Sequence, residues 1–265
     1  MSKILNTLIS SGLLLFPTTA GATVIASSSL SSGPVEVTFS DDVSGVSGEL
    51  FSTASASLGP TGVVTSDNNS LPGVADAPAA TDGAMTSDSI FTVDDDIFFS
   101  SESAGSVSDP GEFGNAIGEV TGSFEFTNEI DGLTLTIVTQ LTRSFDLATD
   151  FTGELASGAT SLSLALLNTV AFLPTVQFSN PSCDPNAAFS VSNGDSFSDT
   201  CTTMATYVFE NLPAGIYTLT FASNSSVDVV SEIAEVPVPA AFGLFALGLA
   251  GLRWRARKKA LRSVH

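Results

Sequence analysis

Apolar and polar residues alternate with a period of two along much of the chain. In the clearest run, Val120, Gly122, Phe124 and Phe126 share one face, and the residues between them are polar. Because successive side chains of a strand point to opposite faces, this run predicts a half-buried β-strand. Four further runs alternate in the same way: Val35 to Phe39, Leu133 to Ile137, Leu162 to Leu166, and Tyr217 to Phe221.

Turn-forming residues separate these runs. Asp131-Gly132 predicts a tight hairpin turn, Asn193-Gly194 predicts another turn, and Leu212 to Gly215 leads into a strand. Strands about ten residues apart predict an all-β fold, with residues 23–235 forming one antiparallel, jelly-roll-like β-sandwich. Residues 59–89 are rich in Gly, Pro, Ala, Ser, Thr and Asp and predict an extended or mobile loop. Abundant Ser and Thr elsewhere are interpreted as solvated outer strand faces, with O-glycosylation as the alternative.

Residues 1–22 have the pattern of a secretory signal peptide. Lys3 precedes a short apolar run, and small residues follow up to Ala22. This pattern predicts a signal helix, export by the general secretion machinery and cleavage after Ala22. An uncleaved anchor is the alternative, although the apolar run is short for spanning a bilayer.

The opposite end, residues 236–265, combines a proline motif, an apolar stretch and a basic tail. The motif is Val236, Pro237, Val238, Pro239 and Ala240, and residues 240–252 carry no charge. The basic tail, residues 253–262, includes Arg253, Arg255, Arg257, Lys258 and Lys259. The apolar stretch predicts a short transmembrane helix, and the cations after it place its end in the cytoplasm and the body in the periplasm.

This arrangement resembles the PEP-CTERM sorting signal of Gram-negative bacteria that make exopolysaccharide, in its variant with Val238 between the prolines. The resemblance is confined to about the last 30 residues. It implies that an exosortase recognises and cuts the tail, and that the body is delivered to the cell surface or extracellular matrix. A plain C-terminal membrane anchor is the alternative.

The charge distribution limits the possible partners and chemistry. All 28 Asp and Glu residues lie between Glu36 and Glu235, where Arg143 is the only Lys or Arg. Such a body repels nucleic acid and excludes it as a partner. The only histidine is His265 in the tail, so the body has no imidazole for acid–base catalysis. We therefore expect that the protein is not an enzyme.

Two further groups of body residues suggest specific interactions. Cys183 and Cys201 predict one disulfide in an oxidising compartment. Asp94, Asp95 and Asp96, and separately Asp195 and Asp199, are candidate oxygen ligands for calcium, although neither group matches an EF-hand. The alternative for both is a solvated acidic edge that prevents sheet-to-sheet aggregation.

These observations favour a non-enzymatic, exported component of the cell surface or exopolysaccharide matrix. A carbohydrate- or calcium-binding β-sandwich module is the second hypothesis, by analogy with other sandwiches. A secreted hydrolase is the third, and the missing bases in the body argue against it. Exopolysaccharide and the exosortase are the partners that these hypotheses name, and no cofactor other than calcium is expected.

Overall fold

The structure is a computed structural model that describes residues 23–70, 72–93, 97–109 and 111–231. The predicted signal helix, Asp94 to Asp96, the sorting motif, the short transmembrane helix and the basic tail all lie outside these residues. The contacts divide the chain into two units, Met1–Glu232 and Ile233–His265. Within the described ranges, no helix is long and apolar enough to cross a membrane.

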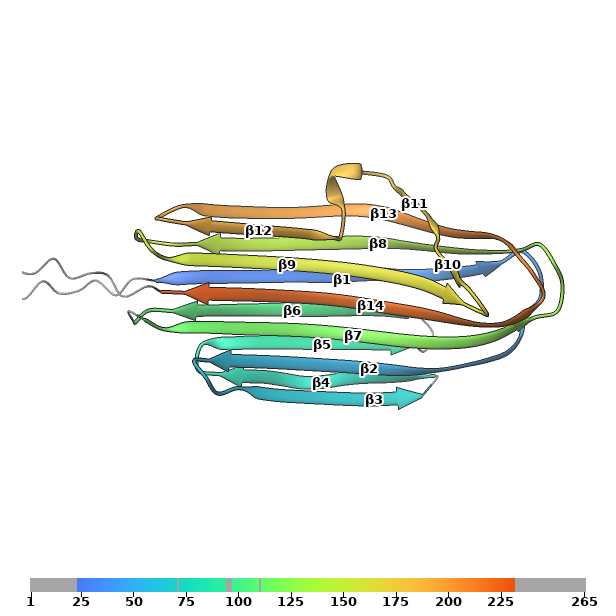
Figure 1. Cartoon of the computed structure of the whole chain (residues 1–265), viewed down its shortest axis with the longest axis horizontal. Helices are drawn as coiled ribbons and strands as arrows, with labels where there is room; N and C mark the ends of the chain where they lie inside the picture. Colours follow the sequence, from blue (N-terminus) through green and yellow to red (C-terminus); the bar gives the residue numbers. More distant parts are fainter. Residues whose placement is uncertain (1–22, 71, 94–96, 110, 232–265) are drawn as a thin grey trace, which may run out of the picture. The chain divides into compact units, whose positions relative to one another are not determined.

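The first unit is an antiparallel β-sandwich (Figure 1). One sheet, called sheet A, has the strand order β11-β13-β8-β1-β6-β5-β4. The other, sheet B, has the order β10-β9-β14-β7-β2-β3, and β12 also pairs with β9. The all-β, antiparallel prediction is confirmed. The strands are β1 (Val24–Phe39), β2 (Ser44–Leu58), β3 (Val63–Ser70), β4 (Gly73–Asp82), β5 (Met85–Val93), β6 (Ile97–Val107), β7 (Phe113–Asn128), β8 (Leu133–Ala148), β9 (Leu155–Leu167), β10 (Ala171–Phe172), β11 (Thr175–Phe178), β12 (Ala187–Ser192), β13 (Ser196–Leu212) and β14 (Gly215–Val230).

Long strands give the sandwich two distinct ends. β1, β7, β8 and β14 each contain 16 residues, which corresponds to roughly 50 Å of extended chain. Val24, at the start of β1, pairs with Val107, and Val230, at the end of β14, pairs with Phe113. Because only a short connection joins Val107 to Phe113, β1 begins and β14 ends at the same end of the sandwich. We call this the terminal end, and the end containing Phe39 and Phe126 the distal end.

The five sequence-predicted runs all lie in strands, but their connections differ from the prediction. Asp131-Gly132 does form a turn, with Gly132 at φ 88°. The turn joins β7 of sheet B to β8 of sheet A, so the predicted hairpin is wrong. Asn193-Gly194 likewise forms a turn and joins β12 of sheet B to β13 of sheet A. Local sequence specified each turn, whereas the assignment of strands to sheets depends on distant partners.

The predicted loop over residues 59–89 is also wrong. This segment contributes all of β3 and β4 and most of β5. β4 pairs with β5, β5 pairs with β6, and β3 pairs with β2. The inward residues are small, including Ala75, Ala77, Ser87 and Ser89, and all four are buried. Their low bulk reflects closely spaced sheets and does not indicate a loop.

The two ends of the sandwich are packed differently. Toward the distal end, large side chains such as Phe91, Phe99 and Tyr217 form the main core cluster. Toward the terminal end, a second cluster is made mainly of Ala and Val residues with Met85 and Leu147. The distance between the sheets must therefore change along the strands, because small side chains cannot fill a wide gap.

Hydrogen-bonded serines join the sheets where the side chains are small. Ser103 of β6 donates to the Ser225 carbonyl of β14 over 3.0 Å, and Ser87 of β5 donates to the Ser55 carbonyl of β2 over 2.8 Å. The hydroxyls of Ser52 and Ser89 lie 2.7 Å apart across the same interface. Ser52, Ser87, Ser89, Ser103 and Ser225 are buried, so for these five residues the interpretation as solvated surface is wrong. Satisfied hydroxyls of this kind fix how the two sheets lie against each other.

Gly118 of β7 lies where the two sheets approach each other closely. Its backbone N–H donates to the Ser103 hydroxyl of the opposite sheet over 3.0 Å. A Cβ atom at this position would lie 2.6 Å from the Asp88 carbonyl oxygen and 2.9 Å from that of Glu102. Only glycine fits here without moving the backbone of β5 or β6.

Candidate functional site

Arg143 of β8 has a buried structural environment. It is 6% exposed, and its Nη2 lies 2.8 Å from Asp199 Oδ2 on the neighbouring strand β13. Its Nη1 donates to the Asp184 carbonyl over 2.6 Å. The guanidinium carbon lies 5.7 Å from the ring centre of Phe145 and 5.6 Å from that of Phe189. The one cation of the body therefore contacts β8, β12, β13 and the segment that carries Asp184, and it stabilises their packing.

The disulfide between Cys183 and Cys201 is confirmed. Cys183 ends the 3₁₀ helix η1 (Pro181–Cys183), and Cys201 lies in β13. The Asn180 side chain caps η1 by accepting from Ser182 N. The two cysteines are 18 residues apart in the sequence. Their bond links the segment around Cys183 and Asp184 to β13 of sheet A.

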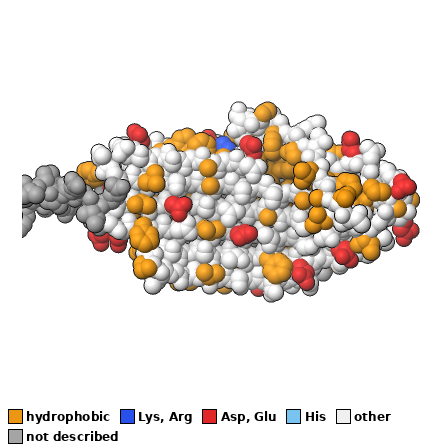
Figure 2. Space-filling view, in the orientation of Figure 1, with side chains coloured by type: hydrophobic (Ala, Val, Ile, Leu, Met, Phe, Trp, Pro, Cys, Tyr) orange, Lys and Arg blue, Asp and Glu red, His pale blue; other side chains and the backbone are white. Residues whose placement is uncertain are grey.

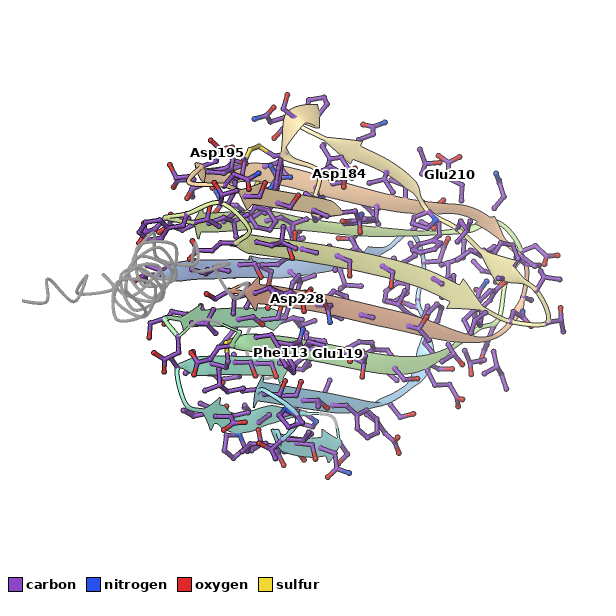
Figure 3. The ribbon with its side chains drawn as sticks, turned by 60° about the vertical axis from the view of Figure 1, so that its left-hand side comes forward. Phe113, Glu119, Asp184, Asp195, Glu210 and Asp228 are labelled. Atoms are coloured by element: carbon purple, nitrogen blue, oxygen red, sulfur yellow. A yellow bond between two sulfur atoms is a disulfide. The ribbon has the colours of Figure 1, made fainter. Side chains whose placement is uncertain are left out.

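The candidate calcium ligands that the structure describes are not arranged as a metal site. Asp199 is paired with Arg143. Asp195 lies in the turn before β13, where its backbone carbonyl accepts from Thr149 N over 3.0 Å. Asp184 directly follows Cys183 of the disulfide, and Figure 3 labels Asp184 and Asp195 at separate places along the sandwich. Within the described ranges, no group of three acidic, histidine or cysteine side chains could hold a metal ion.

A polar groove of ≈ 390 Å³ lies on the outer face of sheet A. Its floor follows one row of paired residues across β8, β1, β6 and β5: Ser144, Ser29, Glu102 and Asp88. Glu102 and Asp88 are exposed and directly opposite each other, an arrangement that is unfavourable for two like charges. No local pattern in the sequence marks these residues, because Asp88 and Glu102 come together only when β5 pairs with β6.

The last strand leads directly toward the proline motif. β14 ends at Val230, and Ser231 still pairs through its backbone with Glu112. Four residues, from 231 to 234, separate this strand from Glu235. Residues 235–258 match the family model for the PEP-CTERM protein-sorting motif. The chain therefore carries a PEP-CTERM sorting signal.

The PEP-CTERM match confirms the resemblance inferred from the sequence. It includes Val236 to Ala240 and the basic residues from Arg253 to Lys258, and Lys259 lies immediately after it. The PEP-CTERM signal marks an exported protein that an exosortase recognises and processes on its way to the cell surface. The comparisons with curated proteins and with solved structures found no match to the chain.

Proposed function

We propose that this protein is a non-enzymatic structural component of the cell surface or the exopolysaccharide matrix. The observation that carries the proposal is the PEP-CTERM signal placed directly after the final strand of a continuous sandwich. Three features of the body support it: the sheets are joined by buried serine hydrogen bonds, Arg143 is used within the fold, and a disulfide fastens one side. The hydrogen bonds and the ion pair favour a rigid body. The disulfide favours an oxidising environment outside the cytoplasm.

The surface charge supports a role in a hydrated matrix. Acidic side chains are distributed over the face that Figure 2 shows, between patches of hydrophobic and uncharged atoms. Figure 3 labels Glu119 and Asp228 on β7 and β14, where both side chains are exposed on sheet B. A strongly acidic body stays soluble and attracts counter-cations. Such a body would occupy space within a polysaccharide network without adhering to anionic membranes or nucleic acid.

Processing at both ends tests the proposal. We expect the surface form to begin at Thr23 and to end within or close to Val236 to Ala240, and intact-mass analysis of the surface fraction measures both ends. Replacing Pro237 and Pro239 with alanine, or disrupting the exosortase gene, should leave the full tail attached and keep the protein in the inner membrane. Replacing Pro213 with alanine in the body is the matched control and should leave sorting unchanged. A surface form that still ends at His265 contradicts the proposal.

A carbohydrate-binding role is the second candidate, and the groove on sheet A favours it. Its outward hydroxyls, from Ser27, Ser29, Thr86 and Ser144, and its two carboxylates are groups that hydrogen-bond to sugar hydroxyls. Sedimentation of the protein with the host's exopolysaccharide, with and without calcium, tests this role. The double substitution Asp88→Asn and Glu102→Gln should weaken binding, whereas Asp228→Asn on the outer face of sheet B should not. If the wild type, the double variant and Asp228→Asn all sediment equally with the polysaccharide, the groove is excluded as the binding site.

A further inference from the structure

An apolar cavity of ≈ 250 Å³ lies between the two sheets, toward the distal end. Both sheets form its walls, and six of the lining residues are Val35, Phe99 and Ile137 from sheet A and Leu164, Leu219 and Phe221 from sheet B. It is far along the strands from Val24 and Val230, which mark the terminal end. The cavity is separate from the groove on the outer face of sheet A and from the Arg143 cluster.

Backbone irregularities explain why the sheets leave space here. The pairing of β1 with β8 shifts between Ser32 and Val35, and the pairing of β2 with β7 shifts between Ser44 and Ser47. Such bulges bend a strand and increase its twist. Val35 and Val46 stand at these two shifts, on opposite sheets, and both line the cavity. The serine contacts hold the sheets close at the other end, so the sandwich opens toward the bulges.

The lining determines what kind of molecule fits. Apart from Thr139, Tyr207 and Glu125, every lining side chain is a hydrocarbon. Protein interiors contain few voids larger than a water molecule, and apolar cavities stay dry and accept apolar molecules. Because an engineered apolar cavity of about 150 Å³ in another protein accepts benzene, this larger cavity has room for roughly ten carbon atoms.

Charge restricts the polar end of such a molecule. Val46 lines the cavity and is 63% exposed, so the cavity opens to solvent beside it. Glu125 pairs with Ser47, the neighbour of Val46, and its exposed side chain belongs to the solvent-facing row of β7 near this opening. Arg143, the one cation of the body, is not among the lining residues and is paired with Asp199. A carboxylate or phosphate head group at Glu125 would be repelled, and an uncharged or cationic head group would not.

We propose that this cavity binds the hydrocarbon chain of a small amphiphile whose head group is uncharged or cationic. The chain lies between the sheets among Leu164, Leu219 and Phe221, and the head group lies at the opening beside Val46. This binding activity adds to the structural role and does not depend on it. It also gives the distal end of the body a function separate from the terminal end, where the sorting signal begins.

A ligand series on the full-length chain tests the proposal. Decylamine, decan-1-ol and decanoate are titrated below their aggregation concentrations, with calorimetry for binding and circular dichroism for the melting temperature. We expect one decylamine or decanol per chain, an increase in melting temperature, and at least tenfold weaker binding of decanoate. Affinity should rise about fourfold per methylene from hexylamine to decylamine and then level off, because each buried methylene adds a similar transfer free energy until the cavity is full. Binding that is absent, unsaturable or independent of chain length overturns the proposal.

Two substitutions on the same strand locate the site. Leu219→Phe adds volume inside the cavity, since Leu219 is 8% exposed and lines it. Ile216→Phe adds the same ring three residues away, where Ile216 is 59% exposed on the outer face. We expect Leu219→Phe to weaken decylamine binding at least tenfold and Ile216→Phe to leave it unchanged. Both variants retain the apolar tail, so equal binding by the two would place the ligand outside the cavity and refute the proposal.

Two further variants complete the test. Val35→Phe fills the cavity from sheet A and should also weaken binding, which covers the case in which Leu219→Phe does not fold. Glu125→Gln should reduce the difference between decylamine and decanoate and leave decanol binding unchanged. If Glu125→Gln leaves the preference for decylamine over decanoate at its full value, the assignment of the head group to the opening near Glu125 is wrong.

Discussion

The guanidinium of Arg143 and the carboxylate of Asp199 meet at 2.8 Å, diagonally across the β8–β13 pair. Their side chains are 7% and 33% exposed. Because the arginine is buried among Phe145 and Phe189, removing its partner leaves a charge that water cannot solvate fully.

We predict that Asp199→Ala lowers the free energy of unfolding by about 2 to 3 kcal/mol, less than the loss of a fully buried pair because Asp199 is partly solvated. Urea denaturation in moderate salt measures the loss. Asp195→Ala, four residues earlier in an exposed turn, is the matched control and should change stability by less than about 0.5 kcal/mol. Equal effects of the two substitutions would show that the ion pair contributes little.

The close approach of the sheets at Gly118 gives a second prediction. Gly118→Ala forces a Cβ against the Asp88 and Glu102 carbonyls, and overpacking of this kind costs about 1 to 3 kcal/mol. The same substitution should expose the strained sheet interface to hydrogen exchange at Ser103 and Ser225. Ser123→Ala, on the outer face of the same strand, should be nearly neutral. If Gly118→Ala is as stable as the wild type, the two sheets are farther apart than this structure places them.

Tyr207 predicts a loss of stability at alkaline pH. Burial raises the pKa of the Tyr207 hydroxyl well above its ordinary value, and the negative charge of Asp184 raises this pKa further. The folded protein therefore keeps a proton that the unfolded chain releases near pH 10, so the stability from this group is complete below about pH 10 and falls as the pH rises above it.

Denaturant unfolding between pH 8 and pH 11 tests this prediction. Tyr207→Phe should lower the slope of stability against pH above about pH 10, because the titrating hydroxyl is gone. Phe178→Leu is the control: the Phe178 ring packs edge-on against Tyr207 with centres 6.5 Å apart, so this substitution removes packing but leaves the proton. Identical slopes for the wild type and Tyr207→Phe would contradict the assignment.

The acidic composition gives a prediction about salt. With 28 acidic residues in the chain and Arg143 as the one cation between Glu36 and Glu235, repulsion destabilises the compact body at low ionic strength. The melting temperature should rise with sodium chloride, and magnesium and calcium at equal concentration should have equal effects, because diffuse screening does not depend on the size of the cation. Scanning calorimetry provides the measurement. Stabilisation by micromolar calcium in physiological salt, lost in Asp195→Asn, would instead indicate a specific site.

Several features could be predicted from the sequence because they depend on neighbouring residues. The alternation in Val120 to Phe126 and in Tyr217 to Phe221 identified the buried faces of β7 and β14, since a strand presents alternate residues to opposite faces. The sorting signal was recognised in the same way, because its proline motif, apolar stretch and basic residues are consecutive. Asp131-Gly132 and Asn193-Gly194 specified turns through the backbone conformations that these residues adopt readily.

Only the tertiary structure decided which strands meet. The sequence could not show that the turn at Gly132 passes from one sheet to the other, because strand pairing is set by partners up to 123 residues away, as in Ile25↔Ala148. Nor could it show that β3, β4 and β5 are strands, because their buried Ala and Ser residues lack the hydrophobic signal of a core. These small residues are buried because the opposite sheet comes close enough for Ser87 to reach Ser55, and Ser89 to reach Ser52. The cavity has the same origin: its lining residues come from nine strands of both sheets. The space among them exists because the sheets are held together at the serine contacts and diverge at the bulges of β1 and β2. Local pattern thus determined the strands whose inward residues are bulky, whereas the distance between the sheets determined which small residues are buried and where a cavity remains.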